Sequence, residues 1–297
     1  MPVKREPSPV VLDTWRSAKA VCFDVDSTLC TDESIDEIAA FLGVGEEVAA
    51  LTSQLSLFLC FCVFIFPPFL FSPSRALALR AIVPFFSDEE EEHRKKTGKK
   101  NRAMGGSTKF EDALAARLGL MKPSRAQIDD FIAQNPPKLS PGIPELVNEL
   151  QARGTKVFLV SGGFRAVIEP IADSLQIPRS HVFANSILFD AETGAYSGFD
   201  PQEHTSRSGG KLSAVRAIRK EHQGAAPETA FPIVAVGDGI TDAEAVSADG
   251  SGADIFIGYG GVVERAAVAE RADWFVKSIQ ELRDALQKGK GKNGVAA

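Results

Sequence analysis

Short apolar runs alternate along this chain with segments of helical periodicity. The runs lie at residues 21–23, 157–160, 233–236, 255–257 and 274–276. They lack the strict alternation of polar and apolar positions that is typical of a strand with one solvated face, so we expect both faces of the sheet to be covered. Amphipathic helical patterns lie between the runs, at residues 143–153, 164–175, 211–221, 262–271 and 279–288. This order predicts an α/β fold with a doubly wound, Rossmann-like parallel sheet.

Further helical patterns fall between the first two predicted strands. Ser34 and Glu37 have the spacing of a capping box, and apolar residues then repeat at helical intervals. Two more helical patterns follow at residues 109–120 and 124–133. We therefore predict that a helical cap is inserted into a discontinuous catalytic core. The predicted boundaries are residues 1–33 and 139–288 for the core, 34–138 for the cap and 289–297 for a disordered tail.

A segment inside the predicted cap differs from the rest of the chain in composition. No charged residue occurs from Val48 to Ser74, and eight of the 20 phenylalanines lie between residues 55 and 86. The apolar part is long enough to span a membrane, but Pro67 and Pro68 interrupt it. A span would also separate the residues on its two sides, which the chemistry below requires to be together. Membrane contact through residues 54–74 is therefore the less favoured alternative.

Composition limits the classes of function. The formal net charge of −6 disfavours a nucleic-acid binder, which usually carries a basic face, so we expect a small-molecule partner and no nucleic acid. The four cysteines form no CxxC pair and the four histidines are scattered, which predicts a reducing compartment and no zinc site. The first twenty residues contain no apolar signal-peptide region, so we expect a cytoplasmic location, with a plastid as the alternative if a targeting segment is missing.

Polar residues follow three of the apolar runs, where the strands are expected to end. Asp24 and Asp26 follow the first run, Ser161 and Gly162 follow the second, and Asp238 follows the run at 233–236. In parallel α/β sheets, ligands bind beyond the carboxyl ends of the strands. These side chains are therefore expected to meet at one edge of the sheet.

A pair of carboxylates at this edge suits phosphoryl transfer. Asp24 can attack phosphorus, while Asp26 gives a proton to the leaving oxygen and later takes one from water. Clustered carboxylate oxygens favour Mg²⁺, and Asp238 would be the third of them. Each motif alone is weak, because DxD, SGG and GDG sequences are usually solvated turns. Their occurrence at three strand ends, in this order and followed by Gly209-Gly210-Lys211, favours a catalytic site.

These motifs are similar to those of a known family. The string CFDVDST at residues 22–28 resembles the first motif of the haloacid dehalogenase-like phosphatases, and VFLVSGGF, GGK and VGDGITD resemble the later ones. Glu33, RAMGGSTKFEDALAARL, LSPGI and FIGYGG are most similar to the members of that family that hydrolyse O-phosphoserine. The similarity covers about residues 18–52 and 102–285.

The resemblance implies roles in the core for particular residues. Asp24 would be the nucleophile that becomes an aspartyl-phosphate, and Asp26 the general acid and base. Mg²⁺ would be held by Asp24, the backbone carbonyl of Asp26 and Asp238. The phosphate would be held by Ser161, Gly162 and Lys211, and the metal side would be supported by Thr241 and Asp242.

In the cap, the resemblance implies that Glu33 faces the substrate ammonium and Arg117 its carboxylate. Met104, Gly105 and Phe110 would shape the closed pocket. From the residues alone, Arg117 could equally belong to a solvated helix face with Glu111 and Asp112, and Met104 could fill the core.

The resemblance is interrupted at about residues 54–101. We interpret this segment as a translated intron or an error in the gene structure, with a functional insertion as the alternative. Two other functions remain open at this point. The chain could hydrolyse another small phosphomonoester, or it could be an impaired or membrane-associated form because of the insertion. The sequence makes no prediction of oligomeric state.

Overall fold

A computed structural model describes residues 6–52, 109–223 and 230–288 of the 297. The atypical segment 54–101, the tail 289–297 and the predicted pocket residues Met104 and Gly105 lie outside the described residues. Everything below concerns the described part of the chain.

Six parallel strands form the central sheet, which confirms the predicted α/β fold. Their order is β3-β2-β1-β6-β7-β8, so the chain leaves β1 in one direction and later continues from β6 in the other. The switch point therefore lies between β1 and β6, where ligands of such sheets bind. The strands are β1 (Ala20–Phe23), β2 (Lys156–Phe164), β3 (Val182–Asn185), β6 (Ile233–Gly237), β7 (Ile255–Tyr259) and β8 (Trp274–Val276).

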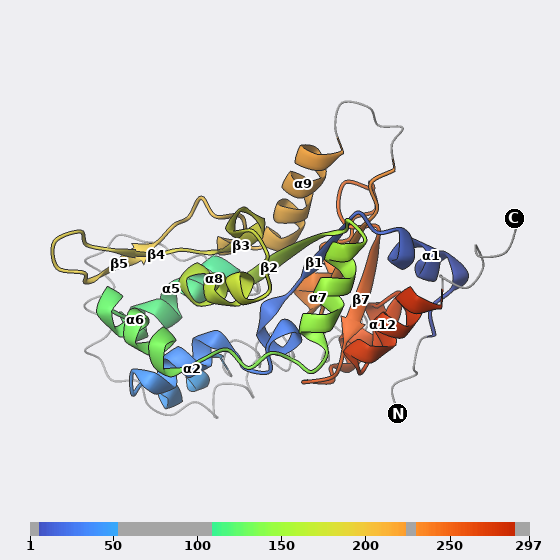
Figure 1. Ribbon diagram of the computed structural model, residues 1–297. Coiled ribbons are helices and arrows are strands. Elements are labelled where there is room, and N and C mark those ends of the chain that lie inside the picture. The colour runs from blue at the N-terminus through green and yellow to red at the C-terminus, as the bar shows by residue number, and fades with distance from the viewer. Residues whose placement is uncertain (1–5, 53–108, 224–229, 289–297) are drawn as a thin grey trace, which may run out of the picture. The chain divides into compact units, whose positions relative to one another are not determined.

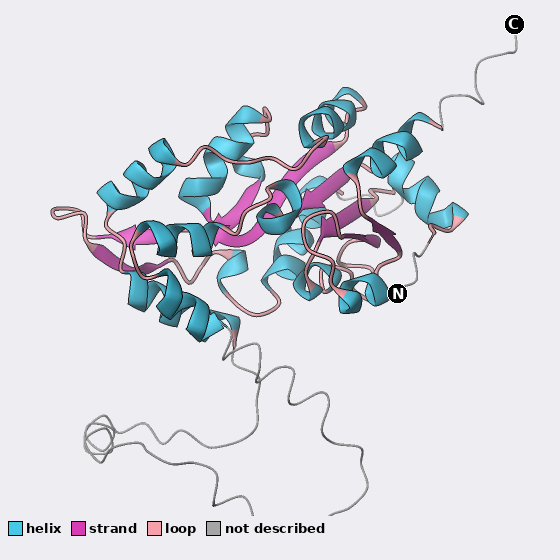
Figure 2. Cartoon of the chain, turned by 90° about the horizontal axis from the view of Figure 1, so that it is seen from below, coloured by secondary structure: helices cyan, strands magenta, loops and turns pink. Residues whose placement is uncertain are grey.

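Helices cover both faces of this sheet, as Figures 1 and 2 show. One face carries α1 (Pro9–Ser17), α7 (Ile143–Ala152), α8 (Arg165–Ser174) and α12 (Ile279–Gln287), and the other carries α9 (Gly210–His222) and α11 (Ala266–Arg271). The two faces have separate hydrophobic clusters, because successive strand residues point to opposite sides. This arrangement explains why the strand runs are apolar at every position.

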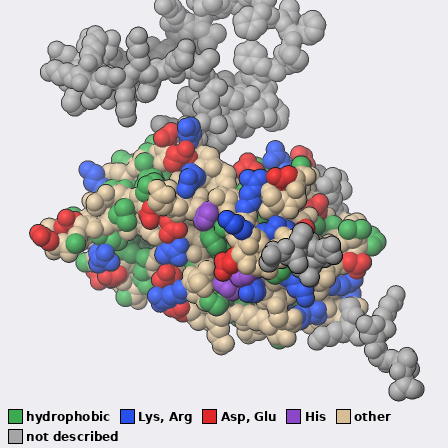
Figure 3. Space-filling view, turned by 90° about the horizontal axis from the view of Figure 1, so that it is seen from above, with side chains coloured by type: hydrophobic (Ala, Val, Ile, Leu, Met, Phe, Trp, Pro, Cys, Tyr) green, Lys and Arg blue, Asp and Glu red, His purple; other side chains and the backbone are tan. Residues whose placement is uncertain are grey.

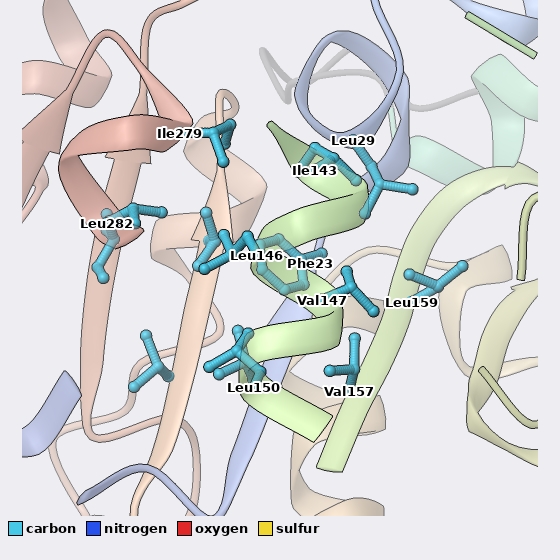
Figure 4. Close-up of a cluster of buried hydrophobic side chains, with 14 of the residues drawn as sticks. Phe23, Leu29, Ile143, Leu146, Val147, Leu150, Val157, Leu159, Ile279 and Leu282 are labelled. Carbon is cyan, nitrogen blue, oxygen red and sulfur yellow. The ribbon is translucent and has the colours of Figure 1, made fainter. Parts of the chain in front are cut away.

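Helix α7 illustrates how the sequence builds the core. Ile143, Leu146, Val147 and Leu150 recur at helical spacing and are all buried, and Figure 4 shows them beside Phe23 of β1. Burial of each such side chain contributes about 1.5–3 kcal/mol. Gly142, with φ of +89°, precedes the helix in a left-handed conformation that favours glycine.

A third hydrophobic cluster lies among helices α2 (Ser34–Phe41), α5 (Phe110–Met121) and α6 (Arg125–Gln134). The antiparallel hairpin of β4 (Ile187–Phe189) and β5 (Tyr196–Phe199) packs against the same cluster. Its turn contacts α6 directly, because the Arg125 amide donates to the Gly194 carbonyl at 2.9 Å. The helices of the predicted cap range are thus joined by a hairpin from the predicted core range.

The predicted capping box at Ser34 and Glu37 is wrong. Helix α2 begins at Ser34 itself, Glu33 occupies the N-cap position, and the Glu33 side chain makes no capping hydrogen bond. The Ser34 amide instead donates to Asp26 Oδ1 at 2.8 Å. A carboxylate from the adjacent loop therefore takes the place that a local capping residue would have filled.

None of the helices within the three described ranges combines the length and apolar composition that a membrane crossing needs.

Candidate active site

Asp24 and Asp238 lie next to each other at the switch point of the sheet. Asp24 follows β1 and Asp238 follows β6, and these two strands are paired in parallel from Ala20 opposite Ile233 to Phe23 opposite Val236. The Asp24 amide extends this pairing by donating to the Val236 carbonyl at 2.9 Å. The turn η1 (Val25–Leu29) then reverses the chain with Ser27 at φ +52°. The strand pairing thus brings together carboxylates more than two hundred residues apart in the sequence.

Lys211, near the start of α9, lies between two of the predicted site carboxylates. Its Nζ is 2.8 Å from Asp24 Oδ1, and it also pairs with Asp242 of α10 (Ile240–Ala243). Burial alone would lower the pKa of Lys211, but the charges of Asp24 and Asp242 outweigh burial and raise the pKa. The lysine therefore stays charged at physiological pH and provides a fixed cation beside the Asp24 carboxylate.

Three carboxylates gather into a candidate metal site. Oxygen atoms of Asp24, Asp238 and Asp242 lie within 4.8 Å of one another, and Asp238 and Asp242 are buried. Thr28 donates to Asp238 Oδ1 at 3.1 Å, and Asp238 Oδ2 pairs with Arg265. Burial and the charge of Asp24 raise the pKa of Asp242, although the charge of Lys211 opposes this effect. This set of hard oxygens can hold a divalent cation.

Asp26 faces a different set of groups. Its Oδ1 accepts from the Ser34 amide, and its Oδ2 is 3.4 Å from the Ser161 hydroxyl, which donates to it. Burial first and the charge of Asp24 second raise the pKa of Asp26 to about 6, against the lowering effect of the Ser34 amide. A carboxyl with this pKa can carry a proton at a pH at which an ordinary aspartate has lost it.

Ser161, Gly162 and Gly163 lie at the end of β2, which continues through Phe164 instead of ending at residue 160. The Gly163 amide donates to Ser161 Oγ at 2.9 Å, and the buried Asn185 side chain donates to the Gly162 carbonyl at 2.7 Å. A β-carbon on Gly163 would lie 2.9 Å from Asp26 Oδ2, so a larger residue here would displace the Asp26 carboxylate. The predicted phosphate-binding peptide is thus adjacent to Asp26.

Phe110 and Glu33 lie at the boundary between the helical cluster and the sheet. The Phe110 ring is adjacent to Gly162, because a β-carbon on that glycine would lie 3.1 Å from Phe110 Cζ. Glu33 accepts from the Ser27 hydroxyl at 2.6 Å. Burial lowers the pKa of Arg117 in α5, while the charges of Asp36 and Glu33 oppose that effect. Arg117 is therefore half-buried within the electrostatic reach of Glu33, and does not lie on a fully solvated face.

Two groups at the site were not found from the sequence. Arg265 donates to the Asp238 carbonyl at 3.0 Å, pairs with the Asp238 carboxylate and lies 3.9 Å from Glu33 Oε1. Asn185, which holds the Gly162 carbonyl, accepts from Thr205 at 3.0 Å. Neither residue stands in a local motif, since both act through contacts with distant segments. Thr241, which was predicted to support the metal side, is exposed in α10.

A cavity of about 330 Å³ lies behind this site, between α8 and the end of α6. Asp26 lines it, but Asp24, Lys211 and Asp238 do not. On the face of the molecule in Figure 3, acidic and basic side chains are interspersed.

The chain is similar to the family described as haloacid dehalogenase-like hydrolase over residues 18–248. It is 43% identical over 280 residues to the chloroplastic phosphoserine phosphatase of Arabidopsis thaliana, with 94% of this chain and 76% of that protein covered.

Solved structures agree with this similarity. A phospho-aspartyl intermediate analogue of phosphoserine phosphatase matches with a TM-score of 0.59 and 25% identity, over 90% of this chain and 98% of that one. DsGPDH of Dunaliella salina matches with a TM-score of 0.66 and 33% identity, over 95% of this chain. This chain spans only 38% of that longer one.

Proposed function

Because this chain belongs to the haloacid dehalogenase-like hydrolases, we propose that it is a phosphoserine phosphatase, which hydrolyses O-phosphoserine to serine and phosphate. The predicted family and reaction agree with the phosphoserine phosphatases among its relatives. The observation that carries the proposal is the 2.8 Å pair between Asp24 Oδ1 and Lys211 Nζ beside two further carboxylates. The side chains that we propose as nucleophile, phosphate-binding cation and metal ligands lie together at the carboxyl ends of β1 and β6.

The side chains support a two-step displacement. Asp24 attacks phosphorus and forms an aspartyl-phosphate as the bond from phosphorus to the serine oxygen breaks, while Asp26 gives its proton to that oxygen. Water then attacks phosphorus, its proton passes to Asp26, and the Asp24 carboxylate leaves. Lys211 and the Ser161–Gly162 peptide neutralise the phosphoryl oxygens throughout. Inorganic phosphate is released and Asp26 is protonated again.

Asp24, Asp238 and Asp242 are the residues that would hold a divalent metal, and we propose Mg²⁺. When bound, the metal would neutralise charge on the phosphoryl group. We propose a more direct part for Asp242 in this set than the sequence suggested, since its carboxylate lies within 4.8 Å of those of Asp24 and Asp238. The backbone carbonyl of Asp26 remains a proposed further ligand.

Removing the metal should abolish most activity. With excess chelator, hydrolysis of phosphoserine should fall about 10²-fold or more, because the loss of a Lewis acid costs several kcal/mol of transition-state stabilisation. Phosphate release measures this effect, and excess Mg²⁺ added back should restore the rate. Unchanged activity in chelator would contradict the metal assignment.

Glu33 and Arg117 support selection of a zwitterionic substrate. We propose that the Glu33 carboxylate faces the ammonium group and the Arg117 guanidinium the carboxylate. Their proximity is consistent with the effect of Glu33 on the pKa of Arg117. Arg265, 3.9 Å from Glu33, adds a second cation near the same end of the site. Phe110 would close the pocket over Gly162, and Met104 and Gly105 remain proposed contacts.

Replacing Arg117 with alanine should therefore harm phosphoserine hydrolysis selectively. The loss of transition-state stabilisation, calculated from kcat/KM for phosphoserine, should be about 2–5 kcal/mol. The reason is that the substrate carboxylate loses its arginine partner in an enclosed charge pair. Hydrolysis of an aryl phosphate, which lacks the amino-acid end, should change little. The matched control is Arg125→Ala, which removes an exposed arginine that lies over the Phe189 ring. Equal losses of Arg117→Ala on both substrates would make Arg117 structural.

A phosphate-release panel tests the substrate itself. Phosphoserine should be hydrolysed with a higher kcat/KM than phosphothreonine or a sugar phosphate. Preference for another member of the panel would leave the family intact and favour the alternative of a different small phosphomonoester.

The location of the protein remains a proposal. The Arabidopsis relative is named chloroplastic, which supports the plastid alternative to the predicted cytoplasm. Fluorescence microscopy of a fluorescently tagged protein, expressed from the full-length transcript, would distinguish the two compartments.

A further inference from the structure

Helix α5 begins without a capping side chain of its own. Lys109 holds the N-cap position and its side chain makes no capping hydrogen bond. The first helical amide, that of Phe110, instead donates to the Ser208 hydroxyl at 3.1 Å. Serine is a favoured capping residue because its oxygen satisfies an amide that the helix leaves free. Ser208 supplies that oxygen from 98 residues further along the chain.

Glu111, the next residue of α5, completes the contact. The Ser208 amide donates to Glu111 Oε2 at 3.0 Å, and the Ser208 hydroxyl donates to the same oxygen at 3.1 Å. Hydrogen bonds from the backbone amides of Glu111 and Ser208 lower the pKa of this carboxyl, so it is ionised at neutral pH. Ser208 thus both accepts from α5 and donates to it, as the two residues of a capping box do within one helix.

The contact joins two parts of the proposed active site. On one side, the Phe110 ring covers Gly162. On the other, Ser208 stands three residues before Lys211, in the loop that follows η5 (His204–Ser206). The η5 turn before that loop is held in place, because Thr205 donates to Asn185, whose amide holds the Gly162 carbonyl. Loss of the contact would release only the first turn of α5, and with it the Phe110 ring, from its place over Gly162.

The contact is at the surface and adds little to the stability of the fold. Its hydrogen bonds are exposed, and exposed polar pairs contribute little to stability. Leu114 and Leu118, which are fully buried, fix α5 in its cluster without help from Ser208. A weak contact at this place can form and break in each catalytic cycle, which a strong buried one could not do.

We propose that Ser208 and Glu111 are positioning residues, which hold Phe110 over Gly162 when the substrate phosphate is bound. This inference rests on the proposed function, since it assigns the Gly162 peptide to the phosphate. It adds to the site two residues that never touch the substrate.

Kinetics of three variants test the proposal. Ser208→Ala and Glu111→Gln should each raise KM for phosphoserine about three- to tenfold with little change in kcat, because binding is weakened equally in the ground and transition states. The combined variant should be little worse than either single one, because both remove the same contact. Ser208→Thr, which keeps the hydroxyl, should restore KM.

Asp112→Asn is the matched control. Asp112 stands in the same first turn of α5 and carries the same charge, so its replacement perturbs the helix dipole equally. KM should stay within about twofold of the parent for this control. An equal rise in KM for Asp112→Asn and Glu111→Gln would assign the effect to helix charge and overturn the proposal.

Hydrogen exchange gives a readout that does not depend on turnover. In Ser208→Ala, the Phe110 amide should exchange several-fold faster by NMR, while the buried amides of α5 keep their protection. Faster exchange with unchanged KM would show a contact that does not position Phe110, and would overturn the proposal. If the parent prefers another phosphomonoester but the variants raise KM for that substrate, the positioning role stands and only the proposed substrate is wrong.

Discussion

Replacing Asp24 with asparagine is expected to abolish phosphoserine hydrolysis, with a loss of at least about 10³-fold in kcat, because an amide cannot form the aspartyl-phosphate. The substitution keeps the size of the side chain. Lys211 retains Asp242 as a charge partner, so the fold should survive. Phosphate release measures the loss, and circular dichroism checks the fold. Intact-protein mass spectrometry should detect phosphorylated parent enzyme after rapid acid quenching, and no phosphorylated variant.

The control for this experiment is Asp242→Asn. It removes the other carboxylate that pairs with Lys211, but leaves the nucleophile in place. Activity should be reduced, and the aspartyl-phosphate should still form. Appreciable turnover by Asp24→Asn in a folded protein would remove Asp24 from the nucleophilic role.

Replacing Asp26 with asparagine should lower kcat about 10²- to 10⁴-fold, because both proton transfers pass through this carboxyl. Phosphate release at several pH values tests this expectation. An activated phosphate ester, whose leaving group needs no proton, should lose less activity in the first step than phosphoserine does. An equal loss on both esters would argue that Asp26 acts on something other than the leaving oxygen.

The same substitution should stabilise the metal-free protein above pH 6. The pKa of Asp26 is raised from 3.8 in the unfolded chain to about 6 in the fold, so the folded state binds the proton more tightly. Stability is therefore lost as pH rises from 4 to 6, and the full penalty, roughly 3 kcal/mol, applies above that range. Asparagine avoids the penalty and keeps an acceptor for the Ser34 amide. Thermal unfolding of both proteins at pH 4 and pH 8 should show a gain in Tm at pH 8 only.

A higher Tm at both pH values would assign the gain to packing instead of charge. A lower Tm at pH 8 would mean that the Asp26 carboxylate stabilises the fold, contrary to its raised pKa.

The sequence predicted the central sheet well because its strands are buried on both faces. Each of the five apolar runs corresponds to a strand, and the polar residues that follow three of them meet as expected. The sixth strand, Val182–Asn185, was missed because its run of large apolar residues is only two long, with the small Ala184 and the polar Asn185 following Val182 and Phe183. The hairpin at 187–199 was missed because its short strands are only partly buried and do not form continuous apolar runs like those of the central sheet.

Contacts between distant segments limited prediction of the site. Ser34 has the sequence signature of a capping residue, but the fold brings the Asp26 carboxylate to its amide. Arg265 reaches Asp238 and Glu33 from a loop whose sequence has no recognisable motif. Asn185 is fully buried, yet a single asparagine after a short apolar run is uninformative by itself. Such residues can be recognised as part of the site only once the spatial arrangement of the strands is known.

The hairpin of β4 and β5 limits how this architecture can diversify. Ile187, Phe189 and Tyr196 pack against the helices of residues 34–134, although they are encoded after β3. Exchanging only residues 34–138 between homologues would set foreign helices against an unmatched hairpin and leave apolar surface without its partner. An exchange of substrate selectivity between homologues should therefore succeed when residues 187–199 are transferred together with the helices. The helices and the hairpin that pack together are therefore encoded in two separate stretches of the gene, and neither stretch can be exchanged successfully without the other.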